Sequence, residues 1–321
     1  MRGFSEKWTD LPDYILGITK EIWEGRGIDT LNHYYEENIP MRLPEGVSIG
    51  NKKTINGTLA TLAEFPDRQL IGEDVIWSGN DKDGFLSSHR LLTTGSHTGG
   101  GYFGPPTGKK FVIRAIADCA AINNQINDEW LIRDTAGLVK QLGLEPMQFA
   151  KDLIEREGGP EKCVKPFSKK TDVPGPYKGK GNENEWGERL SVILTNLMSK
   201  DIATIQREYD RAVQTEHPGS ITAHSWSETE YLWMSLISSF PNATFNVEHQ
   251  IGREDPLQPP RAAVRWSMSG KHEGWGMFGQ PTNVDVYIMG FTHAEFGPNG
   301  LRREFTLYDP VSIWKQIFMN S

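Results

Sequence analysis

The carboxylate of Asp134 is the first candidate for chemistry in this chain. Trp130 stands four positions before it in a run typical of a β-strand, so both side chains would point to one face of that strand. A carboxyl group beside an indole in a dry pocket would have its charged form disfavoured, which would raise its pKa and suit it to proton transfer. The alternative is that Asp134 caps a helix that begins at Thr135.

Two histidines, His97 and His272, occupy matching places before glycine-containing turns. An imidazole at such a strand end would polarise a carbonyl group or shuttle a proton. The alternative, which we favour, is that each histidine bonds a nearby backbone group and fixes its turn.

Asp118 lies in a predicted strand, where alternation places it on the same face as Arg114. If this face lines a pocket, both side chains give that pocket polar groups, and His293 stands at the place equivalent to Asp118. The alternative, which we hold slightly more favourable, is a solvated strand end.

His89 and Arg90 are neighbours in another predicted strand and therefore face opposite sides. We assign His89 to the pocket. Arg90 recurs as Arg265, and a recurring buried arginine usually has an ion-pair partner. We expect that partner to be the strand carboxylate Glu129, with Glu304 as its equivalent.

These residues belong to a sequence repeat with a constant offset of 175 positions. The segment 95–107 returns as 270–282 with eight of thirteen residues identical, and Phe65-Pro66 returns as Phe240-Pro241. A constant offset without insertions indicates one fold duplicated in tandem. The repeat predicts a first domain at 1–154, a linker at 155–185 that is rich in Pro, Gly and Lys, and a second domain at 186–321. The Pro and Lys content favours an extended strap over the surface for this linker rather than a packed element.

Each copy begins with helical patterns and continues with strands. Apolar residues at helical spacing predict helices at 13–23 and 54–64, with counterparts at 190–198 and 228–238. Short alternating runs predict antiparallel strands at 74–77, 85–94, 110–122 and 126–133. Helices followed by strands favour the α+β class, in which a curved sheet folded over its helices would enclose a pocket.

Composition excludes several classes of protein. The chain of 321 residues has 34 basic and 42 acidic residues and a net charge of −8, without a basic face for nucleic acid. Since the sequence shows neither a secretory signal nor a membrane span, we expect a soluble, cytoplasmic protein. The two cysteines are too few for a disulfide scaffold, and no residues have metal-ligand spacing, so we expect no metal.

The sequence resembles the SnoaL-like polyketide cyclases and predicted ester cyclases of the NTF2-like group. The resemblance rests on Phe65-Pro66-Asp67, on Gly95-Ser96-His97 with the Gly104-Pro105-Pro106-Thr107-Gly108-Lys109 run, and on Glu129-Trp130, Asp134 and Gln141-Leu142-Gly143. It spans most of 32–144, and the second copy matches more loosely over 209–317. It implies two cone-shaped α+β barrels, each with helices packed on a curved antiparallel sheet, and acid/base chemistry without a cofactor.

The resemblance also implies roles for the residues discussed above. An aspartate near the end of the last strand serves the cyclases as general acid/base in an aldol closure, and Asp134 occupies that place, with His97 and Asp118 as further catalytic candidates. The substrate pocket would include the following residues of the first copy and their equivalents in the second: Trp130, His89, Arg114, Asp309, His272, Phe305 and His293.

Two functions from different classes follow. The first is an enzyme that cyclises or isomerises a small carbonyl compound in the first domain, with dehydration and epoxide hydrolysis left open. The second is a module that binds an apolar or aromatic small molecule without turning it over. In either case we expect the two copies to pack as an intrachain pseudo-dimer, with a homodimer left open, and we expect neither nucleic acid nor membrane as a partner.

Overall fold

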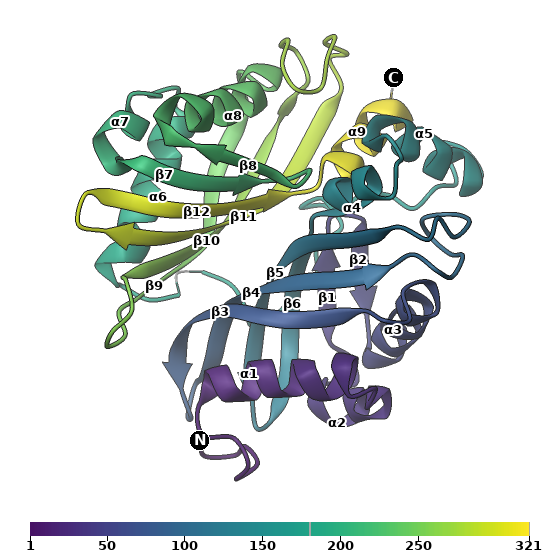
Figure 1. Ribbon diagram of the computed structural model, residues 1–321, viewed down its shortest axis with the longest axis vertical. Coiled ribbons are helices and arrows are strands. Elements are labelled where there is room, and N and C mark those ends of the chain that lie inside the picture. Colours follow the sequence, from purple (N-terminus) through teal and green to yellow (C-terminus); the bar gives the residue numbers. More distant parts are fainter. Residues whose placement is uncertain (180, 321) are drawn as a thin grey trace.

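The computed structural model describes residues 1–179 and 181–320. These residues form two domains of the α+β class, each built on one six-stranded sheet (Figure 1), as the repeat predicted. Residue 180 of the expected linker and residue 321 of the expected second domain lie outside the described residues.

The first domain contains the helices and strands predicted at its beginning and in its sheet, together with two short strands that the sequence did not predict. Its elements are α1 (Leu11–Thr19), a π-helical turn (Lys20–Glu24), a 3-10 turn (Ile28–Thr30), α2 (Leu31–Tyr34), β1 (Pro40–Leu43), β2 (Gly46–Ile49), α3 (Asn51–Glu64), β3 (Gln69–Asn80), β4 (Gly84–Ser96), β5 (Lys110–Ile122), β6 (Gln125–Arg133), α4 (Thr135–Gln141) and α5 (Pro146–Arg156).

The second domain repeats this order of helices and strands, without a counterpart of α5. Its elements are α6 (Glu185–Met198), α7 (Thr204–Glu208), β7 (Tyr209–His217), β8 (Ile221–His224), α8 (Ser225–Ser239), β9 (Thr244–Arg253), β10 (Arg261–Lys271), β11 (Asp285–Gly297), β12 (Gly300–Tyr308) and α9 (Pro310–Met319).

Both sheets have the same topology. The strand order is β2-β1-β6-β5-β4-β3 in the first domain and β8-β7-β12-β11-β10-β9 in the second. One pair in each sheet is parallel, β1 with β6 and β7 with β12, and all other paired strands are antiparallel.

Helix α1 shows how the sequence determines the first layer over the sheet. Asp10 caps the helix by accepting a hydrogen bond from the Asp13 N–H at 2.9 Å. Tyr14, Ile15 and Ile18 recur at helical spacing and are buried against the sheet. This amphipathic stripe holds the helix over one face of the first sheet.

The two faces of the first sheet have different neighbours. On β5, Ala115, Ala117 and Cys119 face the helices of their own domain, whereas Ile116 belongs to a cluster that contains residues of the second sheet. Successive side chains of a strand point to opposite faces, so the same division continues along β4 and β6. One face of the first sheet therefore turns toward its own helices and the other toward the second domain.

The two sheets pack against each other through these outward faces, and Figure 1 shows α4, α5 and α9 together where the domains meet. The apolar contact between the sheets includes Ile116, Trp130, Met289 and Phe291. Buried aromatic and aliphatic side chains at this contact make it a continuous core rather than a loose interface.

The segment between the domains is more deeply embedded than its composition suggested. Phe167 and Tyr177 are buried in the core between the sheets. The Tyr177 carbonyl also accepts a hydrogen bond from Arg265 at 3.0 Å. The Pro and Lys content predicted an extended surface strap, but two aromatic side chains gain more from burial than a surface path allows.

Among the helices of the described residues, none has the length and apolar character needed to cross a membrane.

Candidate functional site

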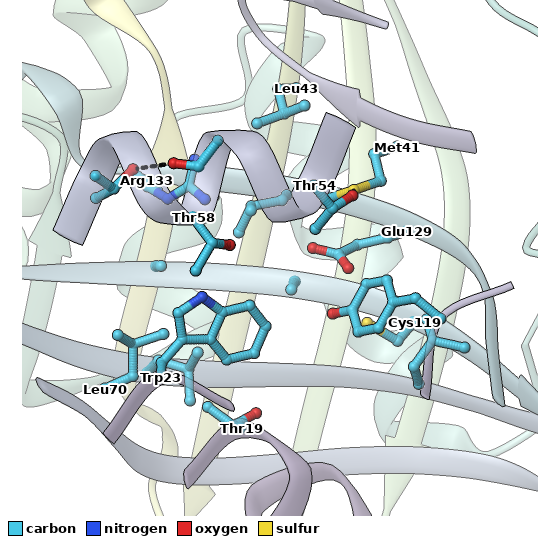
Figure 2. A pocket seen from close by; sticks show the side chains of 18 of the residues that line it. Thr19, Trp23, Met41, Leu43, Thr54, Thr58, Leu70, Cys119, Glu129 and Arg133 are labelled. Carbon is cyan, nitrogen blue, oxygen red and sulfur yellow. Dashed lines mark hydrogen bonds between the residues drawn. The ribbon is translucent and has the colours of Figure 1, made fainter. Parts of the chain in front are cut away.

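A cavity of about 260 Å³ lies inside the first domain, between the concave face of its sheet and helices α1 and α3 (Figure 2). Small side chains on β5 leave this space open, because Ala115, Ala117 and Cys119 extend only a short way from the strand. The cavity is lined mostly by apolar side chains, and its polar groups come from Thr19, Tyr35, Ser48, Lys53, Thr54, Thr58, Thr61, Arg68, His89, Glu129 and Arg133.

A second, wider cavity of about 550 Å³ adjoins the first. Its lining includes the aromatic side chains of Phe65, Phe103 and Phe111, and it reaches the surface at the exposed side chains of Tyr102 and Val164. The two cavities share five lining residues, which form the neck between them: Leu43, Ser48, Thr61, Arg68 and Arg133. A ligand could therefore occupy the inner cavity and extend through the neck into the outer one.

Glu129 is the carboxylate of the inner cavity. It lies on β6, its side chain points toward the middle of the cavity beside Trp23 and Cys119 (Figure 2), and only 4% of the residue is exposed. Its Oε2 atom has no hydrogen-bond partner among the described residues. Burial raises the pKa of Glu129 from 4.5 to about 7, against the opposing effects of a hydrogen bond from Tyr35 and of the nearby Arg133 charge.

The tyrosine–glutamate pair recurs in the second domain. There the Tyr209 hydroxyl donates to Glu304 at 2.6 Å, and Glu304 also lies 3.0 Å from the Nε2 atom of His217. Both oxygen atoms of the Glu304 carboxylate therefore have partners, whereas the Oε2 atom of Glu129 has none among the described residues. The fold itself does not require a free carboxylate oxygen at this place.

His89 supplies a neutral polar group to the same cavity. Its Nδ1 atom is buried without a hydrogen-bond partner among the described residues, and burial lowers its pKa to about 4. A neutral imidazole can donate or accept one hydrogen bond to a ligand near neutral pH. Glu129 and His89 together therefore provide a proton acceptor and a hydrogen-bonding group in one enclosed space.

The second domain fills the space that is hollow in the first. Trp266 and Trp233 stand at the places equivalent to Leu91 and Thr58, and both indoles are fully buried in the core of the second domain. A Cβ atom added at Gly290 would lie 2.2 Å from the Trp266 ring, so the glycine makes room for the indole. The first domain is thus the one with space for a ligand.

Asp134, the expected acid/base, lines neither of these two cavities. Its carboxylate caps α4 by accepting from the Gly137 N–H at 2.9 Å, and it accepts from the N–H groups of Gly219 and Ser220 in the second domain, both at 2.7 Å. These hydrogen bonds occupy both oxygen atoms and join the two domains. The structure thus places Asp134 at a helix end and at the junction of the domains, outside the inner cavity that contains Glu129.

Trp130 and Asp118 lie on the face of the first sheet that packs against the second domain, not in the cavity. The Arg265 guanidinium covers the Trp130 ring at 3.9 Å and donates to the Asp118 carboxylate at 3.0 Å, instead of pairing with Glu304. Burial raises the pKa of Asp118 to about 6, while Arg265 opposes this shift. Their roles are in the interface between the domains.

Arg114, Phe305 and His293 lie in the same interface. Arg114 donates to Glu73 at 2.8 Å, while the guanidinium of Arg90 stacks on Phe305 at 3.6 Å and lies 3.5 Å from the Nδ1 atom of His293. Among the expected pocket residues of the first sheet, His89 is the one that the structure places in the cavity.

The expected ion pair between Arg90 and Glu129 does not form. Arg90 instead bonds Glu73 at 3.1 Å and Glu295 of the second domain at 3.3 Å. The two expected partners are on opposite faces of the sheet, because Arg90 faces the second domain and Glu129 faces the cavity.

The two turn histidines and Asp309 also have local partners. The Nδ1 atom of His97 lies 3.2 Å from the Thr107 hydroxyl, and that of His272 lies 3.2 Å from the Thr282 hydroxyl. Asp309 caps α9, as Asp134 caps α4. These residues fix turns and helix ends in both copies.

Of the polar residues that line the cavity, sequence reasoning assigned only His89 to it. The ones it missed include Tyr35, Arg68, Arg133 and the carboxylate of Glu129. The signal that would have found them is side-chain size, because the run of small residues on one face of β5 marks the hollow side. The sequence analysis instead assigned Trp130 to the pocket, and Trp130 lies on the opposite face of β6, between the two sheets.

Part of the chain matches a known protein family. Residues 14–142 match the model of the family described as SnoaL-like polyketide cyclase. Over these residues, the first domain is similar to that family. Both the inner cavity and Glu129 lie within the matched residues. No curated protein matches the chain.

Solved structures of three proteins resemble parts of the chain. IdmH of Streptomyces antibioticus, described as a proposed polyketide cyclase, is 22% identical, covering 41% of this chain and 98% of its own, with a TM-score of 0.36. A proposed SnoaL-like polyketide cyclase from a Jannaschia species is 15% identical over 43% and 94%, with a TM-score of 0.38. A SnoaL-like polyketide cyclase from Agrobacterium tumefaciens is 17% identical over 41% and 97%, with a TM-score of 0.35.

Proposed function

We propose that the first domain is a cyclase-type enzyme that acts on a small carbonyl compound, with Glu129 as its general base and acid. The observation that carries this proposal is a buried carboxylate with one free oxygen atom in an enclosed cavity. Its pKa of about 7 suits proton transfer near neutral pH, where both the ionised and the protonated form are populated.

The proposed reaction needs only groups of this chain. The Glu129 carboxylate takes a proton from the carbon next to a substrate carbonyl, and the electron pair of the broken C–H bond forms an enolate. Neutral His89 donates a hydrogen bond to the enolate oxygen, which stabilises the negative charge in a low-dielectric space.

Ring closure follows within the same substrate. The enolate carbon attacks a second carbonyl carbon, a C–C bond forms, and the resulting alkoxide receives the proton that Glu129 holds. The carboxylate is thereby restored. Tyr35 holds Glu129 through its hydrogen bond, so that the free oxygen atom points into the cavity.

Deuterium exchange tests the first step without knowledge of the natural substrate. A panel of small aryl ketones and diketones is incubated with the protein in D₂O, and exchange next to the carbonyl is followed by NMR. We expect exchange with the unmodified protein and with Asp134→Asn, and loss of at least a hundredfold in rate with Glu129→Gln, a typical loss for a general base.

The two variants are matched, since each replaces a buried carboxylate by an amide. Circular dichroism and thermal melting establish that both are folded. Equal exchange with Glu129→Gln, or loss of exchange with Asp134→Asn alone, would contradict the assignment. Binding of panel compounds without exchange by the unmodified protein would instead support the alternative of a module that only binds its ligand.

A further inference from the structure

Two arginines at the neck between the cavities have no anionic partner among the residues that the structure describes. Arg68 precedes β3 and is only 5% exposed, and Arg133 is the last residue of β6. Both line the inner and the outer cavity. Among the described residues, no carboxylate lies within 4.0 Å of either guanidinium, and neither guanidinium has a hydrogen-bond acceptor.

The carboxylates that line the same cavities are beyond ion-pair distance of both arginines. Glu64 accepts hydrogen bonds from the backbone N–H groups of Tyr102 at 3.0 Å and of Phe103 at 2.8 Å. Glu129 is bonded by Tyr35 in the inner cavity. Glu45, at the outer cavity, has a buried Oε2 atom that no described residue bonds.

This arrangement is unfavourable for the protein alone. A buried charge without a partner costs free energy, and two like charges repel each other. Burial, together with the neighbouring charges of Arg133 and Arg26, lowers the pKa of Arg68 to about 9. An anion between the two guanidinium groups would remove both costs.

Two other buried arginines of this protein, in contrast, have carboxylate partners. Arg42 bonds Asp128 and Asp172, and Arg265 bonds Asp118. In both cases carboxylates compensate the buried positive charge.

The fold does not require the two arginines at the neck. The second domain has Ala243 at the place of Arg68 and Tyr308 at the place of Arg133, in a sheet of the same topology. The arginine pair therefore accompanies the hollow cavity and is absent where tryptophans fill the equivalent space.

We propose that Arg68 and Arg133 bind a carboxylate of the ligand, so that the substrate is a carbonyl compound that carries a carboxylic acid. Guanidinium groups match carboxylate oxygens through paired N–H donors. The identification of this ligand as a substrate rests on the function proposed above, whereas the binding of a carboxylate does not.

The site also orients the ligand. Arg133 and Glu129 are four residues apart on the same face of β6, which separates their Cα atoms by roughly 13 Å. A carboxylate at the neck would thus direct the carbonyl part of an elongated ligand into the inner cavity toward Glu129, and an apolar remainder would extend into the outer cavity. Two cations against one carboxylate leave a positive charge that favours formation of the enolate.

Calorimetric titration with matched probes tests the proposal. The probes are benzoylpropionate, its methyl ester, its primary amide, and phenyl phosphate. With the unmodified protein we expect the acid to bind roughly 10- to 100-fold more tightly than the ester and the amide, as a charged hydrogen-bonded pair provides. This comparison needs no variant, so it is decisive even if a substitution at Arg68 prevents folding.

Variants then locate the site. Arg133→Gln and Arg68→Met should each reduce the advantage of the acid over the ester by about tenfold or more, whereas Lys52→Gln, which removes an exposed charge on α3, should leave it unchanged. Glu129→Gln should still bind the acid, which separates this proposal from the proposed catalysis. Equal binding of acid and ester, no binding of the acid, or tighter binding of phenyl phosphate would overturn it.

Discussion

Replacing Glu129 by glutamine should stabilise the protein above neutral pH, although it removes the proposed catalytic group. The carboxyl group is 4% exposed, and burial raises its pKa from 4.5, the ordinary value, to about 7. Because the folded state holds this proton more tightly than the unfolded state, the group disfavours folding progressively as the pH rises from about 4.5 through about 7.

The size of the effect follows from the two pKa values. Each pKa unit corresponds to about 1.4 kcal/mol, so the ionised carboxylate costs the folded state about 3 kcal/mol at pH 8 and almost nothing near pH 4.5. Glutamine cannot ionise, and its side-chain oxygen can still accept from the Tyr35 hydroxyl. For a domain of this size the difference corresponds to an increase in Tm of roughly 6–12 °C at pH 8.

Thermal and urea unfolding of the variant and of the unmodified protein, each at pH 4.5 and pH 8, measures this effect. Other titrating groups contribute equally to both proteins, so their contribution cancels in the difference of stability between the two. Glu304→Gln is the matched control, because Glu304 accepts hydrogen bonds from Tyr209 and His217, and we expect that variant to be destabilised at pH 8. If Glu129→Gln is no more stable relative to the unmodified protein at pH 8 than at pH 4.5, the carboxylate is not buried as described and the reasoning fails.

Two further predictions concern the second domain and its junction with the first. Asp134→Ala removes the cap of α4 and the acceptor of two N–H groups of the second domain. We expect urea unfolding to show a loss of stability of about 1–3 kcal/mol, while the rate of deuterium exchange stays the same. Unchanged stability would contradict the structural role of Asp134. Gly290→Ala places a methyl group against the Trp266 ring and should cost about 1–3 kcal/mol, with binding of benzoylpropionate in the first domain unchanged; a neutral effect would mean that the ring is free to move.

The amino-acid sequence alone determined the duplication and most of the elements. The constant offset between Phe65-Pro66 and Phe240-Pro241 and between the two glycine-containing turns predicted two domains of one topology, and the sheets have the same strand order. The predicted helices and main strands lie where the structure has α1, α3, α6, α8 and β3–β6. The spacing of apolar residues and the positions of Gly and Pro predict helices, strands and turns, because both signals depend only on residues close together in the sequence.

The face of the sheet that encloses the cavity was decided only by the tertiary structure. Both faces of β5 are buried, Ala117 toward the helices of its own domain and Ile116 toward the second sheet, so alternation of apolar and polar residues cannot separate them. Packing of the second domain assigns Trp130 and Asp118 to the interface and leaves Glu129 in the hollow. A buried charged residue acquires its role from the partners that long-range contacts bring to it, and the sequence of a strand does not contain those contacts.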